Sequence, residues 1–218
     1  MELSEIQFNI IRFPHPRRSC SGEGDERSAQ PILCRWRHPA VGLVAVNCDA
    51  SYRASNDTGG YGIIIRDHMG RVKMTKASRF RMSCAIDKQK ASRMEYGVKV
   101  LMLEMIAIRD GLRLSKSLGF MAVEVRSDSK TAIAILIGQA PCPDDCREIV
   151  SEIMLELRLF PVLGFIFVYG ECNRAADFLS KFVTGYGEKC MDWSELPQDL
   201  HQIVLEDALG LLIERLPK

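Results

Sequence analysis

Residues 43–67 read LVAVNCDASYRASNDTGGYGIIIRD and contain the two segments that decide the fold. From Leu43 to Asp49, Val44, Val46 and Cys48 alternate with the other side chains, a period of two that is typical of a β-strand. A polar stretch and the pair Gly59–Gly60 follow, and a second β-type run covers Tyr61–Arg66. We therefore predict two strands, of which the first ends on the carboxylate of Asp49.

The chain after Arg66 predicts a third strand and then alternating helices and strands. A turn at 67–70 precedes a strand over 71–80, so the first three strands are expected to form an antiparallel meander. We then expect a loop over 82–96, a helix over 98–118, a strand over 121–126, helices over 127–137 and 144–159, a strand over 162–169 and a helix over 173–182. The order β-β-β-α-β-α-α-β-α predicts an α/β fold with a mixed five-stranded sheet, three antiparallel strands and then two parallel ones, and helices on both faces.

The composition favours one folded domain with two flanking segments. The 218 residues are 47% hydrophobic, which is enough for one sizeable core. Residues 1–39 are expected to be a poorly ordered linker, because 14–39 are rich in Pro, Arg, Ser and Gly and lack apolar periodicity. We place the folded domain at 40–185 and a C-terminal extension with a short helix at 186–218.

Charge, cysteine content and hydropathy narrow the possible partners. A formal net charge of +1 provides no overall basic field, so any binding of nucleic acid must rely on a local patch. The eight cysteines show no repeated spacing and no secretory signal precedes them, which favours a reducing compartment. No apolar run approaches the roughly 20 residues of a membrane span. We expect a soluble intracellular monomer, in the nucleus or cytoplasm, without an obligate protein partner.

Four acidic residues occupy positions where a site for divalent cations could form. They are Asp49 and Asp128 at predicted strand ends, Glu104 in the long helix and Asp177 in the last helix. Carboxylates that converge from different elements suit two hard cations. Glu104 is the most informative, because it lies beside an apolar stripe that surface acids avoid. Taken singly, the other three have structural explanations as a turn start, a helix cap and a solvated helix residue.

Five ordered motifs carry a resemblance to a known family. They are VNCDAS (46–51), GYGIIIRD (60–67), EMIAIRDGL (104–112), VRSDS (125–129) and NRAAD (173–177). Over residues 40–185 the chain resembles the plant ribonuclease H-like domains related to those of retroelement reverse transcriptases. Ala50, Met105 and Gly170 depart from the family pattern without removing any of the four acids. The segment around Trp36 resembles the short approach to such domains, and 193–210 resembles the extension of stand-alone plant members.

The resemblance implies a function and a set of site residues. It implies endonucleolytic cleavage of the RNA strand of RNA/DNA hybrids, with two Mg²⁺ ions, for which Mn²⁺ can substitute, held by Asp49, Glu104, Asp128 and Asp177. It also implies that Ser51 and Asn173 face the hybrid, where RNA is recognised by the 2′-hydroxyls in its shallow minor groove. The histidine that assists cellular ribonucleases H before the last Asp is missing, as is the basic helical segment with which some bacterial relatives grip the hybrid.

Other interpretations remain open from the sequence alone. The domain could be a domesticated retroelement remnant that binds hybrid or structured RNA with weak or no catalysis. A 3′–5′ exonuclease of similar fold is disfavoured, because such enzymes open with Asp-x-Glu, whereas Asp49 precedes Ala50 and Ser51. Glu95 is the nearest rival to Glu104, but it lacks the spacing of the motif.

Overall fold

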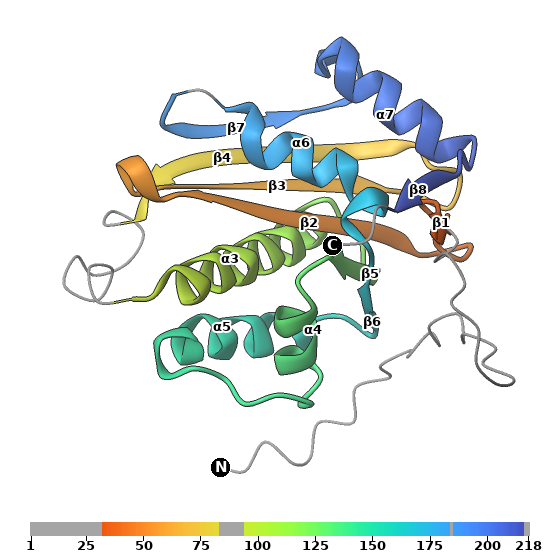
Figure 1. Ribbon diagram of the computed structural model, residues 1–218. Coiled ribbons are helices and arrows are strands. Elements are labelled where there is room, and N and C mark those ends of the chain that lie inside the picture. The colour runs from red at the N-terminus through yellow and green to blue at the C-terminus, as the bar shows by residue number, and fades with distance from the viewer. Residues whose placement is uncertain (1–31, 83–93, 184, 216–218) are drawn as a thin grey trace, which may run out of the picture.

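Six strands form the central sheet of the protein, in the order β6-β5-β2-β3-β4-β7 (Figure 1). This computed structural model describes residues 32–82, 94–183 and 185–215. The strands are β2 (Val44–Arg53), β3 (Thr58–Arg66), β4 (Val72–Arg81), β5 (Ala122–Ser127), β6 (Val162–Phe167) and β7 (Gly187–Met191). The β2, β3 and β4 strands form the predicted antiparallel meander, and β5 and β6 run parallel to β2. The predicted mixed sheet is confirmed.

The sixth strand corrects the predicted count of five. β7 lies in the segment that we placed in the C-terminal extension, and it pairs antiparallel with β4 at the edge of the sheet. Its sequence GEKCM shows no apolar alternation, and only Met191 is buried. The strand forms because β4 presents a row of backbone donors and acceptors that another segment can satisfy.

Helices cover both faces of the sheet, as predicted (Figure 1). The long helix α3 (Tyr96–Ser117) packs with α4 (Lys130–Leu136) and α5 (Arg147–Leu157) over one face. On the other face, α6 (Arg174–Phe182) and α7 (Gln198–Ala208) share a second apolar core with β3 and β4. Short 3-10 helices lie at Ala54–Asn56, Asp144–Cys146, Gly170–Cys172 and Trp193–Glu195. Most of the predicted loop at 82–96 lies outside the described residues.

Two glycines allow the helices that carry site residues to approach the sheet. A Cβ at Gly62 on β3 would lie 2.3 Å from the carbonyl oxygen of Ala176 on α6. On the opposite face, a Cβ at Gly111 on α3 would lie 2.8 Å from Cγ1 of Val46. Any larger residue would push the helix away, so these positions set how closely α3 and α6 lie against the central strands.

The described part of the predicted N-terminal linker is folded, which corrects that assignment for residues 32–39. β1 (Ile32–Cys34) pairs antiparallel with β8 (Ile213–Arg215), and Trp36 is only 2% exposed. The Trp36 ring packs 3.8 Å beneath the guanidinium carbon of Arg66. These contacts are made with parts of the chain that are distant in sequence, so the local periodicity does not predict them. The rest of the predicted linker, residues 1–31, lies outside the described residues.

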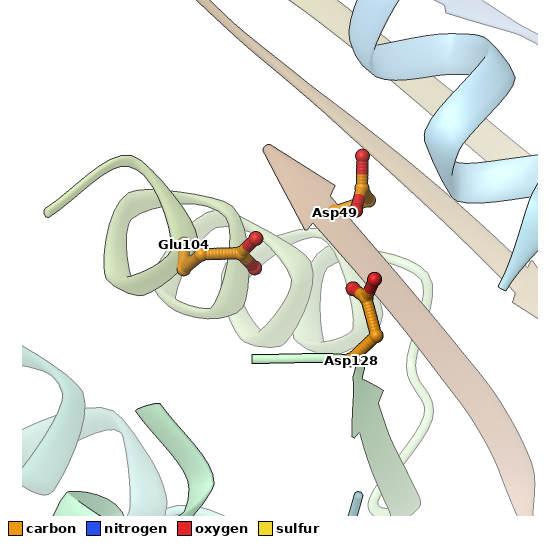
Figure 2. A group of neighbouring side chains, drawn as sticks. All are labelled: Asp49, Glu104 and Asp128. Carbon is orange, nitrogen blue, oxygen red and sulfur yellow. The ribbon is translucent and has the colours of Figure 1, made fainter. Parts of the chain in front are cut away.

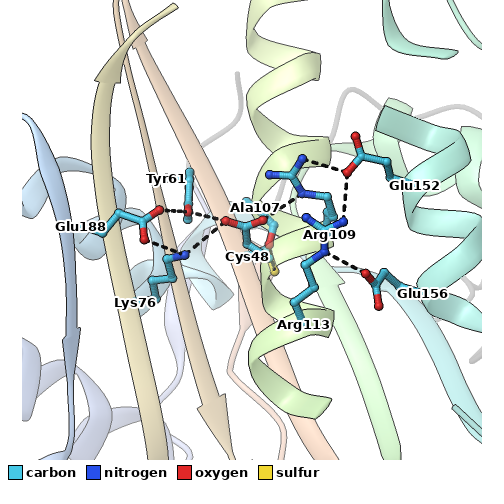
Figure 3. A network of polar contacts seen from close by, with 10 residues as sticks. Cys48, Tyr61, Lys76, Ala107, Arg109, Arg113, Glu152, Glu156 and Glu188 are labelled. Atoms are coloured by element: carbon cyan, nitrogen blue, oxygen red, sulfur yellow. Dashed lines mark hydrogen bonds and ion pairs between the residues drawn. The ribbon is translucent and has the colours of Figure 1, made fainter. Parts of the chain in front are cut away.

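A network of charged side chains connects the sheet with α3 and α5 (Figure 3). Tyr61 donates to Asp110 at 2.5 Å, and Lys76 lies 3.3 Å from Asp110 and 3.1 Å from Glu188 on β7. On the α5 side, Arg109 and Arg113 pair with Glu152 and Glu156. The edge strand β7 is thus joined to β4 by its ladder and to the long helix by polar contacts.

None of the described helices combines the length and apolar character that crossing a membrane requires.

Candidate metal centre

The carboxylates of Asp49, Glu104 and Asp128 meet at one point between β2, α3 and the end of β5 (Figure 2). One oxygen from each lies within 4.8 Å of the others. Strand register explains the meeting of the two aspartates. The parallel pairing of β2 with β5 runs from Val44 opposite Val123 to Asn47 opposite Arg126. Asp49 and Asp128 each lie two residues after this last pair, so the register brings them side by side.

The position of Asp49 differs from the predicted strand end. β2 continues through Ala50 to Arg53, and Asp49 pairs opposite Gly62 within the ladder to β3. The polar residues after Asp49 hide this continuation in the sequence, but the antiparallel ladder to β3 supplies their backbone partners. Asp128 follows directly after β5, as predicted, and Ser129 caps α4 by accepting from the Ala132 amide.

Glu104 is buried on α3, with 5% of its surface exposed. The hydroxyl of Ser127 donates to Oε2 of Glu104 at 3.2 Å, and it accepts the Ser129 amide at 3.0 Å. This short chain of hydrogen bonds fixes the carboxylate of a helix residue relative to the end of β5. Glu95, the rival acid, is the exposed N-cap of α3 and is not in the cluster.

The electrostatics of the cluster favour a bound cation. Burial, and then the charge of Asp128, raise the pKa of Glu104 to about 8. Burial, and then Glu104 and Asp128, likewise raise the pKa of Asp49 well above its usual range. Oδ2 of Asp49 is a buried oxygen without a hydrogen-bond partner. A hard divalent cation fits this site, because it would neutralise the crowded carboxylates and would be a partner for the buried Oδ2 of Asp49.

Asp177 is the predicted site residue that the structure does not bring into the cluster. It lies on α6 as predicted, with its side chain 48% exposed, and it pairs with Lys181 one helical turn later. It shares an open hollow with Asp128, and the other lining residues are Phe167, Tyr169, Gly170, Glu171 and Arg215. The fourth acid therefore flanks the cluster and does not belong to it.

Arg215 is a cation that lines this hollow and that no sequence pattern indicates. It comes from β8 near the C-terminus, and its guanidinium carbon lies 3.9 Å from the centre of the Tyr169 ring. No motif contains Arg215, and only the pairing of β8 with β1 brings it to the acids.

The two predicted nucleic-acid-binding residues make contacts within the protein. Asn173 is 1% exposed, and its amide donates to the Cys48 carbonyl at 2.8 Å and to Asp128 at 3.3 Å. Ser51 donates to the Ser180 carbonyl at 2.8 Å and thereby joins β2 to α6. Their contact with a hybrid stays a prediction.

Two histidines of the described chain form hydrogen bonds with backbone carbonyls away from the cluster, His38 with that of Ala208 and His201 with that of Trp193.

Comparison with known proteins identifies the family. A family model described as reverse transcriptase-like matches residues 47–183. The chain belongs to the reverse transcriptase-like family. That match begins at Asn47, two residues before Asp49, and it includes all four candidate acids. A search of curated protein sequences finds no match for this reverse transcriptase-like chain.

Solved structures confirm that the reverse transcriptase-like chain has a ribonuclease H-like fold. The N-terminal RNase H domain of Rv2228c from Mycobacterium tuberculosis, solved as a fusion with maltose-binding protein, is 18% identical; the similarity covers 64% of this chain and 91% of that one, with a TM-score of 0.53. RNase H1 from Halobacterium salinarum is 19% identical, with coverage of 63% and 94% and a TM-score of 0.53. LC11-RNase H1, crystallised with an RNA/DNA hybrid, is 20% identical, with coverage of 64% and 95% and the same TM-score of 0.53.

Proposed function

We propose that this domain is a metal-dependent endonuclease that cleaves the RNA strand of RNA/DNA hybrids. The observation that carries the proposal is the set of three carboxylates within 4.8 Å, one of which has an orphaned buried oxygen, in a ribonuclease H-like fold. The RNA/DNA hybrid as partner draws support from LC11-RNase H1, a structural relative that was crystallised with one. The plant and retroelement relationship stays a prediction that rests on the sequence motifs.

The acidic residues have distinct parts in the proposed reaction. Asp49, Glu104 and Asp128 would hold Mg²⁺ or Mn²⁺, and Asp177 would complete the coordination of a second ion at the edge of the hollow. When bound, the two ions supply positive charge for the attacking and leaving oxygens of an in-line displacement at phosphorus. Ser127 donates to Glu104 and Asn173 donates to Asp128, which holds these two carboxylates in place, and the scissile phosphate would bind in the hollow beside them.

One observation favours the alternative of a weakly catalytic or inactive nucleic-acid-binding domain. The ammonium group of Lys181 pairs with Asp177 and so occupies the candidate acid that lies outside the cluster. If this pair persists when the hybrid binds, only three of the four candidate carboxylates remain for the ions. Both groups are about half exposed or more, with Lys181 at 61%, and exposed pairs contribute only about 0–1 kcal/mol, so a divalent ion can displace the lysine.

The decisive experiment is a cleavage assay on an end-labelled hybrid in Mg²⁺ and, separately, in Mn²⁺. We expect cuts in the RNA strand, and none in duplex DNA or duplex RNA of the same sequence. A second substrate, with RNA embedded in a strand without free ends, distinguishes internal cutting from exonuclease activity. Asp49→Asn and Asp128→Asn serve as inactive controls, and Lys181→Gln tests whether the ion pair limits the rate. A folded wild type that binds the hybrid and cuts no substrate with either ion would establish the binding-only alternative.

Two further expectations concern the protein in solution. We propose that it acts as a monomer, which size-exclusion chromatography with light scattering would check. Its predicted place in the nucleus or cytoplasm stays a prediction.

A further inference from the structure

Asn47 lies at the centre of a buried polar network that reaches the candidate metal centre along the face of β2 that also carries Asp49. Its side chain is completely buried, and its carboxamide oxygen accepts two hydrogen bonds, from Nε1 of Trp36 at 3.1 Å and from a guanidinium nitrogen of Arg66 at 3.1 Å. An indole N–H and a guanidinium can only donate. The carboxamide of Asn47 therefore has one permitted orientation, with its oxygen toward Trp36 and Arg66.

This fixed orientation determines the orientation of a second carboxamide. The Asn47 amide nitrogen donates to Oδ1 of Asn173 at 3.0 Å, so Asn173 must turn its own amide nitrogen the other way. That nitrogen donates to the Cys48 carbonyl at 2.8 Å and to Oδ1 of Asp128 at 3.3 Å. The two donors at one end of the network, together with the Cys48 carbonyl, thus require that an N–H group faces the carboxylate of Asp128.

The end of the network away from the metal centre is anchored by segments outside residues 47–183. Arg66 pairs with Asp207 on α7 at 2.8 Å, and these side chains are only 1% and 2% exposed. Trp36 comes from the segment before β2, and its ring lies 3.8 Å from the Arg66 guanidinium carbon. Burial lowers the pKa of Arg66, against the charge of Asp207, to about 10, so the guanidinium remains a donor at neutral pH. The N- and C-terminal segments therefore hold the donors in place.

We propose that Asn47 is a positioning residue for the metal centre. Because Trp36 and Arg66 can only donate to its oxygen, Asn47 donates from its amide nitrogen to Asn173, and Asn173 in turn donates to Asp128. This inference rests on the proposed function only in assuming that Asp128 is a metal ligand. A buried polar network can also be purely structural, in which case its loss would lower stability and leave metal affinity unchanged. Residues that orient metal ligands differ, since their replacement typically weakens metal binding or activity about 10- to 100-fold.

The variant Asn47→Asp separates these two roles. Aspartate has the same shape and keeps Arg66 paired, but it offers only oxygens, so it places an acceptor against Oδ1 of Asn173. Asn173 then either turns, which brings its oxygen against the Cys48 carbonyl and Asp128, or is pushed away from residue 47 without turning. In both cases the hydrogen bond from Asn173 to the Asp128 carboxylate is weakened or lost. We expect Mn²⁺ affinity, measured by calorimetry without nucleic acid, to fall about 10- to 100-fold. In the cleavage assay we expect kcat to fall and KM for the hybrid to stay within about twofold.

Two variants serve as controls. Asn56→Asp makes the same chemical change in an exposed turn and should bind Mn²⁺ like wild type. Thr75→Val removes a fully buried hydrogen bond outside the network, from Thr75 on β4 to the Met191 carbonyl on β7, so it should lower the unfolding midpoint and change Mn²⁺ affinity by no more than about twofold. Equal loss of affinity in Thr75→Val and Asn47→Asp would show that lost stability alone matters and would overturn the inference, as would wild-type affinity in Asn47→Asp.

A measurement on the wild type keeps the inference testable if Asn47→Asp does not fold. The side-chain NH₂ signals of Asn173 should shift in NMR spectra as Mg²⁺ is added, with the same midpoint as metal binding, while those of Asn56 stay in place. Unchanged Asn173 signals, or no binding of Mn²⁺ by wild type, would refute the positioning role. A wild type that binds Mn²⁺ and cleaves no hybrid would refute the proposed function and leave this inference standing.

Discussion

Replacing Glu104 by glutamine tests whether the metal-free protein holds a proton that metal binding must release. The pKa of Glu104 is raised from 4.5 to about 8 by burial and by Asp128. Between these two values the folded protein keeps a proton that the unfolded chain has lost, so the free energy of unfolding falls as pH rises and levels off above about 8. Each pH unit in this window costs up to ~1.4 kcal/mol, which limits the total to roughly 4–5 kcal/mol.

The variant Glu104→Gln should remove most of this pH dependence. Its carboxamide oxygen can still accept from Ser127, and it has no proton to lose. The free energy of unfolding should match wild type near pH 5 and exceed it by roughly 2–4 kcal/mol at pH 8, because the buried charge is gone. Asp49, whose pKa burial also raises, contributes a slope of the same sign that remains in the variant.

The assay is urea unfolding from pH 5 to pH 9 with a chelator present. Glu95→Gln is the matched control, since it makes the same change at the exposed N-cap of α3, and its slope should parallel wild type. Adding Mg²⁺ should stabilise wild type more as pH rises, because deprotonation and metal binding are linked, and should stabilise Glu104→Gln little. A wild type whose stability is flat from pH 5 to pH 8, or a Glu104→Gln slope equal to that of wild type, would refute the reasoning.

Three further predictions follow from the same geometry. Asp128→Asn should lower the single-turnover rate on a labelled hybrid by at least ~100-fold, and Asp177→Asn should lower it less, because Asp177 lies outside the cluster; equal losses would contradict this order. Arg215→Gln should weaken hybrid binding in Ca²⁺ and reduce the slope of log affinity against log salt by about 0.9, the value for one phosphate contact, whereas an unchanged slope would place Arg215 away from the backbone. Deleting residues 186–218 removes Asp207, the partner of the buried Arg66, together with β7 and α7, and should cost at least about 3–5 kcal/mol in urea unfolding; a truncated chain as stable as the full one would disprove the contribution of the extension.

The sequence by itself determined the order and type of the main elements. The period-two runs before Asp49 and over Tyr61–Arg66, and the helical spacing around Glu104, are local patterns that survive in β2, β3 and α3. It also determined the candidate acids. Glu104 lies beside an apolar stripe, where a charged side chain is unfavourable unless it has a function, and the ordered motifs contain the other three. The pattern places the end of the first strand at Asp49, but β2 continues to Arg53, because its polar residues after Asp49 pair through the backbone with β3.

Only the tertiary structure decided how these residues meet. The register of β5 beside β2 and the close approach of α3 at Gly111 bring together Asp49, Glu104 and Asp128, and the same geometry leaves Asp177 at the edge. No local pattern indicates β7, the place of Arg215 in the hollow or the donors around Asn47. Arg66 and Asp207 are separated by 141 positions, and each is an ordinary charged residue in its local context. Their pairing depends on burial between distant segments, and no pattern around either residue shows that both become buried together.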